Sequence, residues 1–351
     1  MNSGLIGGKW LIGAAVVGAA FATGRSARAE GTAEGETHGE VHATAPAETH
    51  AEAKEEHDAK GEPHGHHEEK YIAVVYADFV LGFGKGPLAL QNPATSLSTL
   101  PGYRPGAAQV TSESLILGAA IKVLPHTSIG LRLPLSFGTF HPPGADTRGT
   151  AALGNIEIEG EYERHLEPDL AFLGVLGVSL PTAQGDPIPE NLEQLSNQQV
   201  DQGAYDKGGI NRAAAYSRGL EENALFFPKR LGINPKVGII YRSGGFSVAP
   251  YIKMENLIGT TKSTNGYLGE LVPGVRVAYR AGHFEPALKA WATVAFAGAE
   301  EDEKKVGLAL EPQVALHLEN VRWVLGAVVP VVGPAADPQF IGIRLALAGA
   351  F

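Results

Sequence analysis

Apolar and polar side chains alternate repeatedly from residue 71 to the end of the chain. Residues 128–138, SIGLRLPLSFG, show the pattern, because every second side chain is a large apolar one. A period of two predicts β-strands with one apolar face. No 3.6-residue period is sustained outside one loop. The predicted strands are 71–83, 111–124, 128–138, 153–164, 170–180, 231–242, 246–258, 267–280, 284–297, 306–318, 321–332 and 340–351.

The connections between these segments alternate in length. The even-numbered ones read PHT, HLEPD, SGG, AGH and EN, and each is shorter than every odd-numbered one. A membrane barrel with both ends on one side alternates short turns with longer loops, whereas a soluble sandwich has no reason to do so. The parity therefore predicts a closed transmembrane barrel. The long connections are 84–110, 139–152, 181–230, 259–266, 298–305 and 333–339.

The last twelve residues, FIGIRLALAGAF, resemble the closing strand of Gram-negative outer-membrane β-barrel proteins. In that family a glycine precedes alternating apolar residues and a terminal aromatic, and the matching positions are Gly342, Leu345, Leu347 and Phe351. The resemblance implies contact with outer-membrane lipid and recognition by the barrel-assembly machinery. We expect residues 340–351 to pair with residues 71–83, which would close the sheet and leave no free edge.

The predicted fold class is therefore all-β, with a single antiparallel transmembrane β-barrel of about 12 strands in residues 71–351. Prolines inside the segments each remove a backbone donor, so they mark either bulges or wrong strand limits. A count of ten or fourteen strands also fits. Aromatic residues beside the short turns predict an interfacial girdle: Tyr162, Tyr241, Phe246, Tyr279, Phe284, Trp323 and Phe351.

Composition changes sharply before this region. Residues 1–29 hold Lys9, an apolar run over residues 10–22 and the sequence Ala27-Arg28-Ala29, which is the layout of a secretory signal peptide cleaved after Ala29. The run is short for a membrane span, and no second run in the chain is long enough for a membrane helix. We therefore expect an exported protein with the barrel in the cell outer membrane.

Residues 30–70 predict a disordered arm. They contain 12 acidic and 3 basic residues, a net charge of −9, with no aromatic residue, so they cannot bury enough apolar surface to fold. Imidazole binds zinc, copper and nickel, and we hypothesise weak, pH-dependent metal binding by this arm. The alternative is a solvated polar spacer. The candidate ligands are His38, His42, His50, His57, His64, His66 and His67.

By strand parity, one set of polar residues faces the barrel interior. A row of four glutamates at alternating positions cannot point into lipid. Basic residues opposite that row would create a transverse field across a narrow water-filled pore. Alternatively, the same residues form salt bridges that close the interior. The candidate lining residues are Arg132, Glu157, Glu159, Glu161, Glu163, Arg276, Lys289, Glu311, Gln313, His317, Arg322 and Arg344.

The longest connection, residues 181–230, is predicted to fold into the barrel mouth, with a short helix over residues 211–224. The sequence GVSLPTAQGD at its start is similar to a phrase in proteobacterial outer-membrane proteins linked to uptake of aromatic compounds. The similarity covers ten residues and implies the barrel rather than a cargo.

Catalytic motifs are sparse. No G-x-S-x-G, H-E-x-x-H or P-loop sequence occurs, and GFGKG at residues 82–86 precedes a proline-rich loop rather than a helix. Twelve-stranded outer-membrane phospholipases carry Ser and His two residues apart on a strand face. Here only His126 and Ser128 have that order, in a predicted turn.

We therefore predict an outer-membrane channel for passive passage of small polar solutes that is not an enzyme, needs no cofactor and binds no nucleic acid. The arm and both ends of the mature chain would lie in the periplasm. The alternatives are a closed structural or interaction barrel that anchors a metal- or partner-binding arm, and an outer-membrane hydrolase. The sequence indicates no particular solute, selectivity or oligomeric state.

Overall fold

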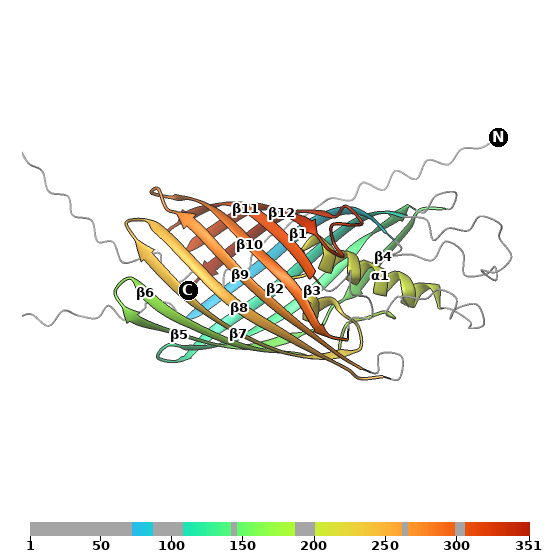
Figure 1. Cartoon of the computed structure of the whole chain (residues 1–351), viewed down its shortest axis with the longest axis horizontal. Coiled ribbons are helices and arrows are strands. Elements are labelled where there is room, and N and C mark those ends of the chain that lie inside the picture. The colour runs from blue at the N-terminus through green and yellow to red at the C-terminus, as the bar shows by residue number, and fades with distance from the viewer. Residues whose placement is uncertain (1–71, 87–107, 142–145, 187–200, 262–265, 299–305) are drawn as a thin grey trace, which may run out of the picture.

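The computed structural model describes residues 72–86, 108–141, 146–186, 201–261, 266–298 and 306–351. Within these ranges, 13 strand segments form one closed antiparallel sheet with 12 positions, because β4 and β5 both pair with β3 (Figure 1). The segments are β1 (Ala73–Gly86), β2 (Ala108–Leu124), β3 (Thr127–His141), β4 (Arg148–Leu153), β5 (Glu157–Glu167), β6 (Leu170–Ser179), β7 (Arg230–Ser243), β8 (Phe246–Gly259), β9 (Tyr267–Tyr279), β10 (Phe284–Ala297), β11 (Val306–Leu318), β12 (Val321–Val332) and β13 (Ile341–Ala350).

The first and last strands close the barrel. The register between β1 and β13 runs from Val74 opposite Ala350 to Phe83 opposite Ile341. Beyond it, the backbone N–H of Ile72 donates to the carbonyl of Phe351 at 2.8 Å. The predicted pairing of residues 340–351 with 71–83 is confirmed, and the sheet has no free edge between its first and last strands.

The predicted alternation of connections is also confirmed where the structure describes them. Short turns of two to four residues join β2 to β3, β5 to β6, β7 to β8, β9 to β10 and β11 to β12. We call that end of the barrel the turn end; Ile72 and Phe351 lie there as well. The opposite end, the loop end, carries the long connections, including the one that holds helix α1 (Figure 1).

Three local predictions had wrong bounds. The fourth strand is not continuous over residues 153–164 but is interrupted at residues 154–156, opposite Pro134, which has no N–H to donate. Residues 139–152 are largely strand rather than loop, because β3 and β4 extend into them. The helix predicted at residues 211–224 is displaced: α1 covers Gln202–Ser217, residues 218–222 form a turn, and the short α2 covers Asn223–Phe226.

The strands continue through the prolines that lie inside them, and not every proline coincides with a bulge. Each proline is paired in the register with only one of its two neighbouring strands, as expected for a residue without a backbone donor. The strand assignments are therefore kept, and the twelve-strand count holds rather than ten or fourteen. The prolines are Pro134, Pro235, Pro250, Pro273, Pro286, Pro312 and Pro330.

The outer face of the barrel is an apolar band. All seven aromatic residues expected beside the short turns are at least 38% exposed, and Phe83, Phe137, Tyr267 and Phe296 are exposed near the loop end. Exposed aliphatic side chains occupy the strands between the two groups. This is the surface that a membrane barrel presents to lipid, with aromatic rings at both interfaces. No helix in the described residues has the length and apolarity to cross a bilayer.

Two glycines make a seat for α1 on the inner wall. Gly82 of β1 lies opposite Gly342 of β13 in the sheet. A Cβ on Gly342 would meet the carbonyl oxygen of Ser217 at 2.1 Å, and a Cβ on Gly82 would meet the Ser217 Cβ at 2.4 Å. The end of the helix therefore approaches the wall as closely as backbone allows.

We predict that Gly342→Val displaces the end of α1 while the barrel still folds. Valine adds three carbons where none fit, and overpacking of this kind costs about 1–3 kcal/mol. Trypsin cleavage at Lys207, Arg212 or Arg218 should become about tenfold faster, whereas the heat-modifiable electrophoretic mobility of the folded barrel should persist. Gly160→Val is the matched control, because a Cβ there meets nothing within 4 Å. Equal cleavage of both variants would contradict the seat.

Candidate functional site

The segment of residues 201–229, which we call the plug, fills the loop half of the barrel interior. Asp201 caps α1, accepting from the backbone N–H groups of Gly203 and Ala204 at 2.9 and 3.3 Å. The side of the plug that faces the barrel wall carries fully buried apolar side chains, with Ile210 and Phe226 among the largest. Ile210 packs with Val110, Phe140 and Phe340 of the wall, while Phe226 belongs to a second cluster that includes wall residues of β1 and β2.

The plug turns sharply after α1. Gly219 and Leu220 both have positive φ, at 65° and 62°, and a Cβ on Gly219 would meet Trp291 at 2.5 Å. The indole N–H of Trp291 donates to the carbonyl of Gly219 at 2.9 Å. This turn points the adjacent acidic pair, Glu221 and Glu222, toward the barrel centre, and residues 218–222 form the plug tip.

A chain of alternating charges crosses the barrel through the plug tip. Arg218 donates to the Asp78 carboxylate of β1 at 2.7 Å, and Asp78 also accepts from Arg344 of β13 at 2.6 Å. Arg218 pairs with Glu222 at 2.9 Å, and Glu222 pairs in turn with Arg132 of β3. The chain continues at both ends, from Arg344 to Glu311 at 3.2 Å and from Arg132 to Glu157 and Glu159 at 3.0 and 3.1 Å.

Glu221 holds the tip to a different part of the wall. Its carboxylate pairs with Lys289 of β10 and accepts from the Tyr251 hydroxyl of β8 at 2.7 Å. Its carbonyl accepts from Lys253 at 2.8 Å. Further along, Asn223 donates to Glu270 of β9 at 2.7 Å. The tip therefore contacts polar groups from several sides of the barrel.

Glu221 and Glu222 lie outside the membrane-spanning strands, and both are ionised at neutral pH. Burial opposes ionisation, but the positive charge of Lys289 outweighs it and lowers the pKa of Glu221 to about 2. Burial likewise acts against Glu222, where Arg132 and Arg218 hold the pKa well below the usual range. Because both pKa values are depressed in the folded protein, the ionised carboxylates of Glu221 and Glu222 stabilise the folded state at neutral pH. This contribution to the free energy of unfolding is lost as the pH falls below about 4.5.

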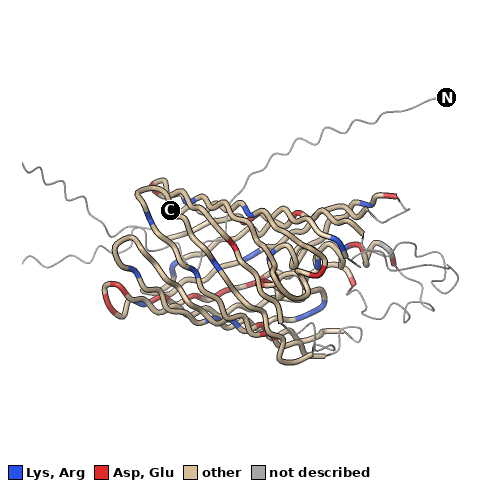
Figure 2. The backbone as a smooth tube through the Cα atoms, turned by 45° about the horizontal axis from the view of Figure 1, so that its top comes forward, with Lys and Arg blue, Asp and Glu red and all other residues tan. Residues whose placement is uncertain are grey.

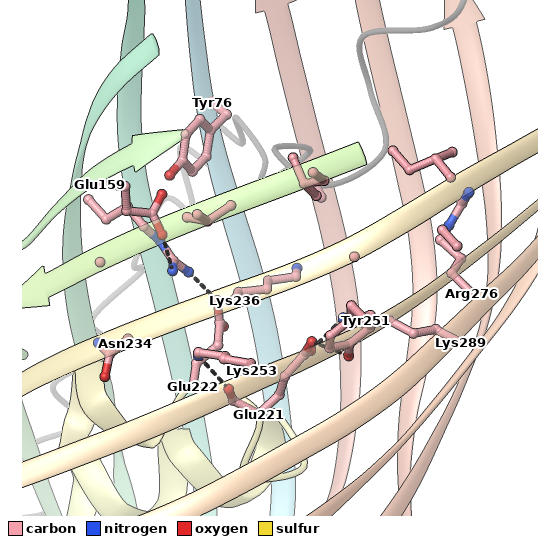
Figure 3. Close-up of a pocket in the computed structure, with 18 of the residues that line it drawn as sticks. Tyr76, Glu159, Glu221, Glu222, Asn234, Lys236, Tyr251, Lys253, Arg276 and Lys289 are labelled. Carbon is pink, nitrogen blue, oxygen red and sulfur yellow. Dashed lines mark hydrogen bonds and ion pairs between the residues drawn. The ribbon is translucent and has the colours of Figure 1, made fainter. Parts of the chain in front are cut away.

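Between the plug tip and the turn end lies a cavity with about 1270 Å³ of empty space, part of it open to solvent. Its floor is the plug tip, with Glu221 and Glu222, and its walls come from both sides of the barrel (Figure 3). Lys236, Lys253 and Lys289 project into it around Tyr251. Seven basic and four acidic side chains line it, a formal excess of three positive charges.

The residues predicted for the interior lie on the inward faces of the strands. Eight of them line the cavity: Arg132, Glu157, Glu159, Arg276, Lys289, Gln313, Arg322 and Arg344. Glu161 and Glu311 are buried behind it, and Glu163 is half-buried near Arg242, 3.9 Å away. His317 lies near the turn end, 3.2 Å from Glu285, which also pairs with Arg276 and with Arg322.

Several interior residues were missed. Asn234, Lys236, Lys253, Glu255, Glu270 and Glu285 share the inward parity of their strands, so the alternation used for the other strands would have found them. Asp78 sits in a strand that is apolar on both faces, where parity gives no answer. Arg218, Glu221 and Glu222 belong to the plug, and no strand period reaches them. Charged positions on the backbone are spread over the barrel wall in Figure 2.

The candidate metal ligands, His38 through His67, lie outside the described residues. Within the described ranges no group of three or more His, Cys, Asp or Glu side chains is arranged to hold a metal ion. Of the pair considered for hydrolysis, His126 is exposed in a turn with its ring 6.4 Å from that of Tyr162, and Ser128 is buried at the start of β3.

One solved structure has a similar fold, and two others are less similar. An outer-membrane channel from Pseudomonas putida F1 matches with a TM-score of 0.51 and 8% sequence identity, over 83% of this chain and 99% of that one. The β domain of the Bordetella autotransporter BrkA has a TM-score of 0.44 and 10% identity, over 80% and 99% of the two chains. LpxR from Salmonella typhimurium has a TM-score of 0.39 and 10% identity, over 78% and 100%.

No protein-family model matches the sequence, and no curated protein matches it. The likeness at 8% identity therefore concerns the fold. Together with the apolar outer band, it identifies the architecture as that of an outer-membrane β-barrel embedded in lipid.

We predict that Asp78→Asn strongly destabilises the folded protein. Asp78 is fully buried between the guanidinium groups of Arg218 and Arg344, and the substitution leaves two buried cations without their shared anion. Breaking a buried pair costs about 3–5 kcal/mol, which urea unfolding of the reconstituted barrel would measure. Asp186→Asn is the control, since Asp186 and Lys229 are one-third exposed and should contribute about 1 kcal/mol or less. Equal losses would contradict the central role of Asp78.

Proposed function

We propose that this protein is an outer-membrane channel for small polar solutes, with the plug tip as its gate. The observation that carries the proposal is the charged cavity, which extends from the plug tip toward the turn end of a lipid-embedded barrel. We further propose that the turn end, where Ile72 and Phe351 lie, faces the periplasm, so that the plug closes the outer mouth.

The chemistry of the interior supports passage rather than simple anchoring. A barrel that serves only as a membrane anchor gains most from a filled apolar core, because burying charge costs free energy that pairing often fails to recover. Here 11 charged side chains line an open space, in which a hydrated solute keeps polar contacts. The channel similarity at the level of fold is compatible with this, although that likeness alone gives no solute.

The two parts of the plug are held differently, which supports a gate at the tip. Helix α1 is seated by buried apolar residues such as Ile210 and Ala213, which have no alternative partner. The tip is held by ion pairs and hydrogen bonds to Lys289, Tyr251 and Arg132. Such contacts can be exchanged for contacts with water or a charged solute, so the tip can move without withdrawal of the helix.

The rivals are a closed structural or interaction barrel and a membrane hydrolase. In the closed-barrel alternative the same salt bridges are permanent, and no current is expected under any condition. For hydrolysis, the hydroxyl of Ser128 accepts or donates no hydrogen bond in the described part of the chain, so it forms no pair with His126, and most of the interior charges are engaged with one another. The channel is therefore the function that the interior supports best.

Planar-bilayer recording tests the gate directly. We expect wild-type protein to show a low open probability. Lys289→Glu places a carboxylate against Glu221, repels the plug tip and should raise the open probability at least about tenfold, since loss of a buried pair exceeds 1.4 kcal/mol.

The charge-swapped double variant Glu221→Lys with Lys289→Glu is the matched control. It restores an opposite-charge pair and should return the open probability toward the wild-type level. If folded wild-type protein and folded Lys289→Glu both carry no current, the channel proposal is refuted in favour of the closed barrel.

For residues 30–70, outside the described part of the chain, we propose weak capture of zinc, copper or nickel in the periplasm. The support is the density of imidazole and carboxylate groups, with three histidines and two glutamates in HGHHEE. The seven histidines are spread along residues 38–67, a spacing that favours several weak sites instead of one defined site.

Zinc titration of the whole protein tests the arm. We expect binding at pH 7.5 that weakens at least about tenfold by pH 5.5, because protons compete for imidazole near its pKa of about 6.5. A variant with all seven arm histidines changed to alanine should lose this zinc binding. Zinc binding that is the same in that variant would remove the proposal.

A further inference from the structure

Four consecutive strands, β7 to β10, present a basic wall to the cavity. Lys236 of β7 lies directly opposite Lys253 of β8, and Arg276 of β9 lies directly opposite Lys289 of β10. Like charges at directly opposed positions of a sheet repel each other. Opposed like charges are tolerated when negatively charged groups lie close enough to offset the repulsion.

Carboxylates of the protein compensate all but one of the basic residues in the cavity lining. Lys253 pairs with Glu255, and Lys289 with Glu221. Arg276 and Arg322 share Glu285, Arg344 pairs with Asp78 and Glu311, and Arg132 pairs with three glutamates. Lys236 is the exception, because no carboxylate oxygen of the described residues lies within 4.0 Å of its Nζ, and Glu221 and Glu159 act on it only from a longer distance.

Lys236 has an aromatic neighbour instead. Its Nζ lies 4.4 Å from the centroid of the Tyr251 ring, a cation–π distance. The Tyr251 hydroxyl is bound to Glu221, so the ring is fixed in place. The ammonium group is thus held at the cavity surface with hydrogen-bond donors available to a ligand. In Figure 3 it projects into the space between the plug tip and Arg276.

The wall beside Lys236 is apolar on the side toward the turn end. Val175 lies opposite Lys236 in the sheet, and Leu173 and Ile240 continue the same inward surface, which Glu161 and Glu163 of β5 border on its other side. The next inward position on β7 is Gly238, which adds no side chain and leaves this strip accessible from the cavity. A charged group and an apolar strip therefore lie next to each other in one cavity.

We propose that Lys236 and Tyr251 form a binding subsite for the carboxylate of a small organic anion, whose apolar part lies against Leu173, Val175 and Ile240. Its use as a step in solute passage rests on the proposed channel function. Binding itself needs only the cavity, so the two can be tested apart. The site selects against neutral analogues, which cannot compensate Lys236, and against anions without an apolar part, which leave the strip uncovered.

Ligand-observed NMR titration of the purified full-length protein in detergent tests the subsite. The probes are butyrate, neutral butyramide of the same shape, and acetate. We expect butyrate to bind about tenfold or more tightly than butyramide, through the charge-assisted hydrogen bond to Lys236. Butyrate should bind up to about tenfold more tightly than acetate, because two further methylene groups leave water.

Variants separate the subsite from general charge attraction. Lys236→Gln should reduce butyrate binding about tenfold, Lys236→Arg should retain it, and Lys85→Gln, at an exposed lysine of the loop end, should leave it unchanged. The proposal is overturned if butyrate and butyramide bind alike, if Lys236→Gln binds as wild type does, or if chloride displaces butyrate at equal concentration.

The outcomes also separate the subsite from the channel. Current through Lys289→Glu without selective butyrate binding would overturn the subsite and keep the channel. Selective binding that depends on Lys236, in a protein that carries no current in any variant, would keep the subsite and refute the channel.

Discussion

The constraint on which the structure depends is that lipid surrounds the barrel, so a charged side chain in the membrane-spanning part of a strand must face the interior, where most such groups find a partner. The chain from Glu311 through Arg344, Asp78, Arg218 and Glu222 to Arg132 meets that constraint. Its two central members, Arg218 and Glu222, come from the plug. The wall charges of β1 and β3 are therefore satisfied by a segment that belongs to neither strand, and the barrel and its plug are energetically one unit.

Most of the fold was predictable because a strand in lipid obeys a strict period of two. Lipid penalises any charge on the outer face, so a row such as Glu157, Glu159 and Glu161 fixes the orientation of its strand from sequence alone. The same reasoning extends to Lys236 and Glu255. It does not extend to Asp78, because both faces of β1 are apolar in the sequence and its partner Arg218 is 140 residues away.

The plug could not be placed for a different reason. Its helix α1 contains Gly203, Gly208 and Gly209, which are poor helix formers, and it begins nine residues before the predicted start. Asp201 caps the helix locally, and tertiary contacts decide its position: the small residues Ala213 to Ala215 against the wall, and the glycine seat at Gly82 and Gly342. At these two positions glycine is required because a larger side chain would clash with the docked helix, and not because of turn geometry.

The distribution of contacts decides which part of the plug can respond to a solute. If α1 moved away from the wall, the exposure of each buried CH₂ group to water would cost about 0.8 kcal/mol of free energy. Water in the lumen offers no contact that replaces this burial. The tip carboxylate of Glu221 can instead exchange Lys289 for water, while Lys289 and Lys236 can accept another anion. A solute carboxylate that enters from the turn end meets Lys236 next to Tyr251, whose hydroxyl binds Glu221. The proposed subsite and the proposed gate therefore share Tyr251 and Glu221, which gives an anionic solute a direct route to loosen the tip.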